Sequence, residues 1–189
     1  MANYQLNEVS PGQQTLHSFD GLTVREITST AILSCAVNPA QSGDVSAVLN
    51  TTLQLNWPSI GNCTTAANAS CLGLQPDQCF VLLENGQKDD QTSAQDTVSA
   101  LQTVAAVTDQ SDAWIIVEIS GERVRDALER ICPIDLDPER FVENSVARTS
   151  MEHLSVIIVR RGEGFLMLSP RSSADSFLHC VVQSAEYVI

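Results

Sequence analysis

Positively charged side chains are scarce in this chain of 189 residues. Ten Lys and Arg residues stand against 23 Asp and Glu residues, so the net charge is −13. Binding to nucleic acid or to an anionic membrane needs clustered cations that neutralise phosphate groups. The composition therefore argues against both partners. It predicts either a solvated acidic surface or an acidic face that meets a less acidic protein.

The sequence also lacks the two patterns that direct a chain to a membrane. A transmembrane helix needs about 20 consecutive apolar residues, and no apolar run comes close to that length. No basic segment followed by an apolar core opens the chain, as a secretory signal would. We therefore expect a cytoplasmic protein. Its six cysteines, none in a Cys-x-x-Cys pair, should then be reduced and mostly buried.

Motifs for metal, nucleotide and nucleophilic chemistry are missing as well. The three histidines show neither of the spacings typical of zinc sites. Gly162 and Gly164 lack the third glycine of a dinucleotide cradle and separate two expected strands. Gly-x-Ser-x-Gly is absent, and nothing indicates a scattered Ser–His–Asp triad, although the sequence leaves one open. We expect no catalytic, cofactor-binding or metal-binding residue in this chain.

Alternating strands and helices are what the sequence does contain. In the first half, the pattern predicts strands within 21–37, a helix over about 43–54, two strands within 72–83 and a second helix ending near residue 104. Residues 58–70 read as a loop.

The second half repeats this plan. It predicts a strand over 114–119 and a helix over 124–131. Strands follow over 142–149, 154–160 and 165–168, and a last helix carries an apolar stripe that includes Phe177.

The repeated plan predicts one α+β domain over 21–189, with pseudo-repeated halves of about 21–106 and 107–189. Residues 1–20 are polar without a period, which predicts an extended arm that becomes ordered on a partner.

A thiol, two carboxylates and two prolines crowd the stretch ICPIDLDPERF, residues 131–141. Pro133 cannot continue the preceding helix. Asp137 and Pro138 have the pattern of an N-cap followed by proline at the first helical position, which predicts a short helical turn. Cys132 follows a helix C-terminus, where a thiolate is disfavoured, so we interpret it as a structural residue.

Four stretches resemble the gamma subunit of heterotetrameric sarcosine oxidase, and they occur in the same order. The strongest joins Ser120-Gly121, the helix after it, and Cys132-Pro133-Ile134-Asp135-Leu136. The others are Leu72-Gly-Leu-Gln-Pro-Asp-Gln-Cys-Phe-Val-Leu-Leu, Val107-Thr-Asp-Gln-Ser, and Arg171-Ser172 with Ala174-Asp175. Cys79-Phe80 replaces the family's Glu-Trp, and Ser173 replaces its Phe, which leaves closely related assemblies open.

The resemblance implies a fold and a role. The fold is the duplicated α+β unit of the folate-binding domain of glycine-cleavage aminomethyltransferase. The role is a non-catalytic subunit, beside alpha, beta and delta subunits, in a complex that demethylates sarcosine oxidatively and passes the one-carbon unit to tetrahydrofolate. FAD, FMN, NAD, zinc and tetrahydrofolate are expected on those partners. The alternatives are the same role in an N-methylglutamate dehydrogenase, or a free-standing folate-binding module.

Three further residues are candidates for a subunit interface. Trp57, beside Pro58 at a predicted helix end, is a candidate anchor, with a place in the core as the alternative. The Arg160-Arg161 pair is a candidate contact for a partner's carboxylates, with a solvated hairpin as the alternative.

Arg171 is expected to pair with Asp175 one helical turn further on, or to meet an anion.

Overall fold

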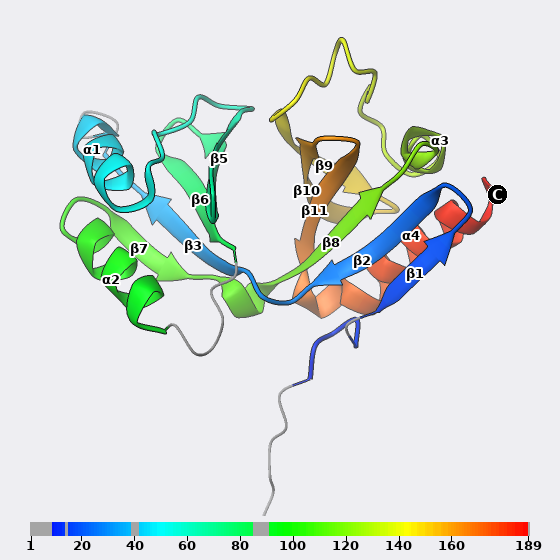
Figure 1. The fold of residues 1–189 in the computed structure, drawn as a ribbon, viewed down its shortest axis with the longest axis horizontal. Helices are drawn as coiled ribbons and strands as arrows, with labels where there is room; N and C mark the ends of the chain where they lie inside the picture. The colour runs from blue at the N-terminus through cyan, green and yellow to red at the C-terminus, as the bar shows by residue number, and fades with distance from the viewer. Residues whose placement is uncertain (1–8, 14, 39–41, 85–90, 189) are drawn as a thin grey trace, which may run out of the picture.

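The fold consists of two antiparallel sheets, each covered on its outer face by two helices (Figure 1). The computed structural model describes residues 9–13, 15–38, 42–84 and 91–188. The five-stranded sheet has the strand order β4-β5-β6-β3-β7, and the six-stranded sheet has the order β1-β2-β8-β11-β10-β9. The α+β fold class is therefore confirmed.

The elements of the five-stranded sheet and its helices come from the first part of the chain. They are β3 (Ala31–Ala36), α1 (Ser42–Leu53), β4 (Cys63–Ala66), β5 (Ala69–Gln75), β6 (Gln78–Leu83), α2 (Gln91–Gln102) and β7 (Ala106–Asp109).

The six-stranded sheet combines the first two strands with the last part of the chain. Its elements and helices are β1 (Leu16–Phe19), β2 (Leu22–Ile27), β8 (Trp114–Ser120), α3 (Val124–Leu128), β9 (Val146–Met151), β10 (Leu154–Arg161), β11 (Gly164–Pro170) and α4 (Ala174–Glu186), with short 3-10 turns η2 (Ser111–Ala113) and η3 (Arg171–Ser173).

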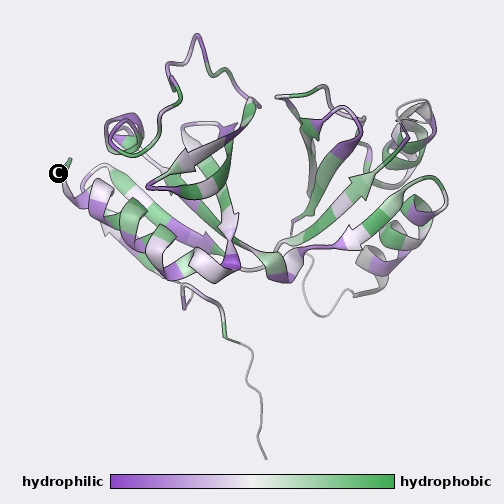
Figure 2. Cartoon of the chain, turned by 180° about the vertical axis from the view of Figure 1, so that it is seen from behind, coloured by the Kyte–Doolittle hydropathy of each residue, from purple (hydrophilic) through white to green (hydrophobic). Residues whose placement is uncertain are grey.

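Three apolar clusters hold these layers together. One joins the five-stranded sheet to α1 and α2 through residues such as Leu49 and Leu101. Another joins the six-stranded sheet to α3 and α4 through residues such as Leu128 and Phe177. The third lies between the two sheets, where Leu82 meets residues of β8, β10 and β11. The central strands are accordingly mostly hydrophobic along their length (Figure 2), because both faces of each sheet are covered.

The chain contains two units of the same topology. The first unit is β2-β3-α1-β4-β5-β6-α2, and the second is β7-β8-α3-β9-β10-β11-α4. The two units exchange their first strands: β2 pairs antiparallel with β8, and β7 pairs antiparallel with β3. Near the start of β4 and β9, an isolated bridge between Asn62 and Ser145 also joins the two sheets.

Several details differ from the sequence predictions; the helix expected over 124–131, for example, ends at Leu128. The expected loop over 58–70 contains β4, because residues Cys63–Ala66 pair antiparallel with β5. The strand expected from residue 142 begins at Val146, since residues 142–145 belong to the preceding loop. Part of the expected arm is ordered on this chain itself, because β1 pairs with β2; residues 1–8 and 14 lie outside the described residues.

No helix in the described part of the chain is long and apolar enough to span a membrane.

Candidate functional site

The loop between α3 and β9 contains the crowded motif, and its carboxylates cap backbone N–H groups. The backbone N–H of Glu139 donates to Asp137 Oδ1 at 2.8 Å, which confirms the predicted cap. The N–H of Asp137 donates in turn to Asp135 Oδ1 at 3.0 Å. Arg125 Nε donates to the carbonyl oxygen of Leu136 at 3.2 Å, so the loop is fastened to α3.

Two apolar side chains of this motif anchor the loop in the core. Cys132 and Leu136 are buried in the cluster under α3 and α4, while Pro133 is exposed at the point where the helical turn has ended. Burial raises the pKa of the Cys132 thiol, which keeps it protonated and poorly nucleophilic at neutral pH. The motif therefore contributes two buried anchors to this loop.

The other thiols follow the same pattern. All six cysteines are free, and every one is buried except Cys180, which is half-buried. Burial raises the pKa of Cys63 and of Cys180 to about 11. Thiolate chemistry at neutral pH is disfavoured at both positions.

Gly121 lies at a close backbone approach between two turns. Its φ is +128°, and a Cβ atom at this position would lie 2.2 Å from the carbonyl oxygen of Gly21. Glycine alone satisfies both conditions without a shift of the backbone. This packing brings the β1–β2 turn against the start of α3.

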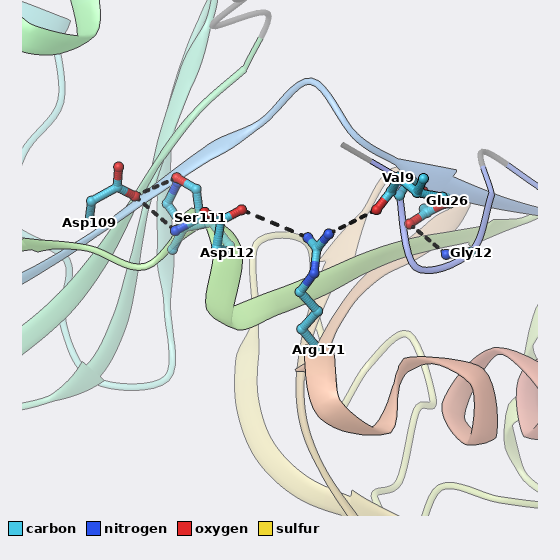
Figure 3. Close-up of polar contacts among 9 residues, drawn as sticks. Val9, Gly12, Glu26, Asp109, Ser111, Asp112 and Arg171 are labelled. Atoms are coloured by element: carbon cyan, nitrogen blue, oxygen red, sulfur yellow. Dashed lines mark hydrogen bonds and ion pairs between the residues drawn. The ribbon is translucent and has the colours of Figure 1, made fainter. Parts of the chain in front are cut away.

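Arg171 joins three segments that are distant in sequence (Figure 3). Its Nη2 donates to the carbonyl oxygen of Val9 at 3.1 Å, and its Nη1 lies 3.9 Å from Asp112 Oδ1 in η2. The expected pairing with Asp175 is therefore wrong: η3 directs the guanidinium away from α4 and towards η2 and the N-terminal segment.

A buried carboxylate holds the same N-terminal segment. Glu26 is 7 % exposed; its side chain accepts hydrogen bonds from the Gly12 N–H at 3.1 Å and from the Ser10 hydroxyl. Sequence reasoning missed Glu26. The available signal was its place in the alternation of β2, where Leu22, Val24 and Glu26 share one buried face.

The Arg160-Arg161 pair makes contacts within this chain. Arg160 Nη1 donates to the carbonyl oxygen of Phe141 at 3.3 Å, and its Nε lies 3.9 Å from Glu143 Oε2. Arg161 reaches from β10 to the other sheet, where Nη1 lies 2.7 Å from Glu84 Oε1 and Nη2 donates to Ser70 Oγ at 2.6 Å. Both guanidinium groups thus make contacts within this chain, although the Nε atom of each is buried without a hydrogen-bond partner.

Trp57 lies beyond the end of α1 and packs against the cluster under α1 and α2, which corresponds to the core alternative. Its backbone N–H donates to Ser46 Oγ at 3.2 Å. The interface roles of Trp57, Arg160 and Arg161 stay predictions.

Side chains that could bind a metal ion are dispersed over the described residues. Within them, no three or more His, Cys, Asp or Glu side chains are grouped in a way that would hold a metal ion. The predicted motif residues are spread over the α3–β9 loop, the start of α3 and η3. Asp135 accepts a backbone hydrogen bond, Cys132 and Leu136 are buried in the core, and Arg171 binds the N-terminal segment.

Two curated proteins are similar to this chain in sequence, and no protein-family model matches it. Sarcosine oxidase subunit gamma from Corynebacterium sp. strain U-96 is 25% identical over 155 residues, which cover 80% of this chain and 73% of that protein. Sarcosine oxidase subunit gamma from Corynebacterium sp. strain P-1 is 30% identical over 103 residues, which cover 54% of this chain and 49% of that protein.

The solved structures with a similar fold include two with TM-scores above 0.6. A chain of heterotetrameric sarcosine oxidase from Corynebacterium sp. U-96 matches with a TM-score of 0.80 at 21% identity, and the match covers 95% of each chain. Aminomethyltransferase T of the glycine cleavage system from Bartonella henselae matches with a TM-score of 0.66 at 10% identity, over 93% of this chain and 57% of that one. The predicted aminomethyltransferase-type fold is confirmed. The resemblance predicted from the four ordered motifs is confirmed as well: in sequence, this chain is similar to gamma subunits of sarcosine oxidase.

Proposed function

We propose that this chain is the gamma-type subunit of a sarcosine oxidase-type complex, in which its role is structural. The observation that carries the proposal is the sequence match to a curated gamma subunit over 80% of this chain. The whole-chain match to a structure of a heterotetrameric sarcosine oxidase supports the same role.

The site geometry supports a non-catalytic role for the chain within that complex. The residues shared with the family motif cap turns, fill the core or fasten the N-terminal segment, and burial raises the pKa of the motif thiol. In the proposed complex, alpha, beta and delta subunits carry FAD, FMN, NAD, zinc and tetrahydrofolate. They demethylate sarcosine to glycine in the cytoplasm and transfer the one-carbon unit to tetrahydrofolate.

The proposal is tested by isolating the chain, with an affinity tag, from its native cells. We expect three other subunits by mass spectrometry, flavin absorption in the visible spectrum, and turnover of sarcosine by the purified complex. Turnover of N-methylglutamate instead of sarcosine would support the subunit role and would identify N-methylglutamate as the substrate of the complex. A colourless chain that is recovered alone would contradict the subunit role.

A further inference from the structure

A pocket of about 190 Å³ opens where the two sheets meet. One wall is a row of cross-strand neighbours in the six-stranded sheet, in which Arg25 is opposite Glu118 and Glu118 is opposite Leu166. Leu82 and Glu84, from the end of β6, line the pocket on the side of the five-stranded sheet, and Arg161 lines it from the end of β10. The pocket therefore has an apolar part and four charged groups.

The charged groups form two ion pairs. Arg25 donates to Glu118 Oε2 from Nη2 at 2.6 Å and from Nε at 3.1 Å. Arg161 Nη1 lies 2.7 Å from Glu84 Oε1. The formal charge of these four groups cancels, so the lining favours neither a net anion nor a net cation.

Each ion pair leaves hydrogen-bonding capacity unused. Arg161 Nε is buried and has no hydrogen-bond partner. Both donations from Arg25 go to the same oxygen of Glu118, and the other oxygen accepts no hydrogen bond from the described residues. Arg161 Nε is enclosed by the chain, so the group that a ligand in the pocket can bond to is the second oxygen of Glu118, whose side chain is 34% exposed.

We propose that this pocket binds a small zwitterion of amino-acid size, with its carboxylate at the guanidinium groups and its ammonium at the carboxylates. Only a ligand that carries both charges interacts favourably with both members of each pair. The size of the ligand follows from the pocket volume of about 190 Å³. This volume is below the range of about 300 to 1,000 Å³ that is typical of pockets for drug-sized molecules. This inference does not depend on the subunit role proposed above.

A purely structural role is the competing explanation for the ion pairs. It applies most directly to Arg161, which links the two sheets through Glu84 and Ser70. It applies less to Arg25 and Glu118, which lie on neighbouring strands of one sheet with side chains 53% and 34% exposed. Exposed pairs of this kind contribute little to stability, so Glu118 is the residue to change.

The test is a titration of the full chain with glycine, followed by nuclear magnetic resonance shifts of backbone amides. We expect saturable shifts at the pocket strands β2 and β8, and much smaller shifts with acetate or methylammonium at equal concentration. Glu118→Gln should weaken glycine binding at least about tenfold, because the ligand's ammonium loses a charge-assisted hydrogen bond.

Asp126→Asn is the matched control, because Asp126 forms an exposed ion pair with Arg123 on α3, away from the pocket. It should leave glycine binding unchanged. If Glu118→Gln does not fold, Arg25→Gln takes its place with the same expected loss. The proposal is overturned if glycine gives no saturable shift, if acetate or methylammonium binds as well, or if the pocket variant binds like the control.

Discussion

The two units share one topology but fill it with different side chains. The cluster under α1 and α2 contains the small thiols Cys35, Cys71 and Cys79. The equivalent cluster under α3 and α4 contains Phe165 and Phe177. The comparison shows that one strand order accommodates cores of different composition.

The connection between the first helix and the next strand differs even more. In the first unit, α1 has 12 residues and a short segment leads to β4. In the second unit, α3 has only 5 residues and the capped loop that contains Cys132 leads to β9. This loop has Asp caps and buried anchors where the first unit has further helical turns, and Cys132, Pro133, Asp135 and Leu136 of the family motif lie here.

The largest expected effect on stability comes from removing an aromatic side chain from the core of the second unit. Phe177→Ala should lower the free energy of unfolding by about 3–5 kcal/mol, since Phe177 is fully buried. Leu101→Ala, at a fully buried position on the equivalent helix α2, should cost less, about 2–4 kcal/mol. Urea denaturation measures both values; a larger cost at Leu101 would contradict the difference between the two cores.

The next effect concerns the entry to α3. Gly121→Ala should lower the free energy of unfolding by about 2–3 kcal/mol, because φ is +128° and the new Cβ would collide with Gly21. Gly43 is the control: it lies in α1 with open space around its Cβ position. Gly43→Ala should stabilise the chain by less than about 1 kcal/mol. Equal effects in thermal unfolding would show that the close approach at Gly121 carries no constraint.

A smaller effect should appear at high pH. The pKa of Cys63 is about 11 in the folded chain, above its ordinary value of 9.0, mainly because of burial. The folded state therefore holds this proton more tightly than the unfolded state. The resulting stabilisation is complete below pH 9 and is lost as the pH rises towards 11.

Cys63→Ala should reduce the slope of stability against pH over this window by roughly 1 kcal/mol per pH unit. Urea titrations at several pH values measure that slope. An unchanged slope would mean that the thiol is not the titrating group.

The smallest effect on stability concerns the contacts of Arg171 with Val9 and Asp112. Arg171→Gln should cost less than about 1 kcal/mol, since the ion pair with Asp112 is long and exposed. Amide hydrogen exchange should nevertheless rise for residues 9–13, which lose the bond to Val9. Arg123→Gln, at an ion pair on α3, is the control and should leave exchange in this segment unchanged.

Most of the fold could be predicted because the spacing of apolar residues that indicates a helix or a strand involves only neighbouring residues. Helices with residues such as Leu49 and Phe177 on one face, and hairpins such as the one at Gly162, are determined by nearby residues. The exchange of β2 and β7 between the sheets was not predictable in this way, because it depends on contacts between residues far apart in the chain.

The site was predictable only where its contacts are local. Asp137 was identified as a cap because its acceptor role is set by the next two residues. Glu84 is 77 residues away from Arg161 in sequence. Val9 is 162 residues away from Arg171. No local pattern contains that information, so the expected pairing of Arg171 with its helical neighbour failed.

The central claim, a structural role without catalysis, is tested most directly by omission. The partner subunits are reconstituted with and without this chain, and flavin content, complex mass and sarcosine turnover are measured. The account predicts that the full complex assembles only with the chain, and that the chain alone turns over no sarcosine. Full assembly and unchanged turnover without the chain, or turnover by the chain alone, would contradict it.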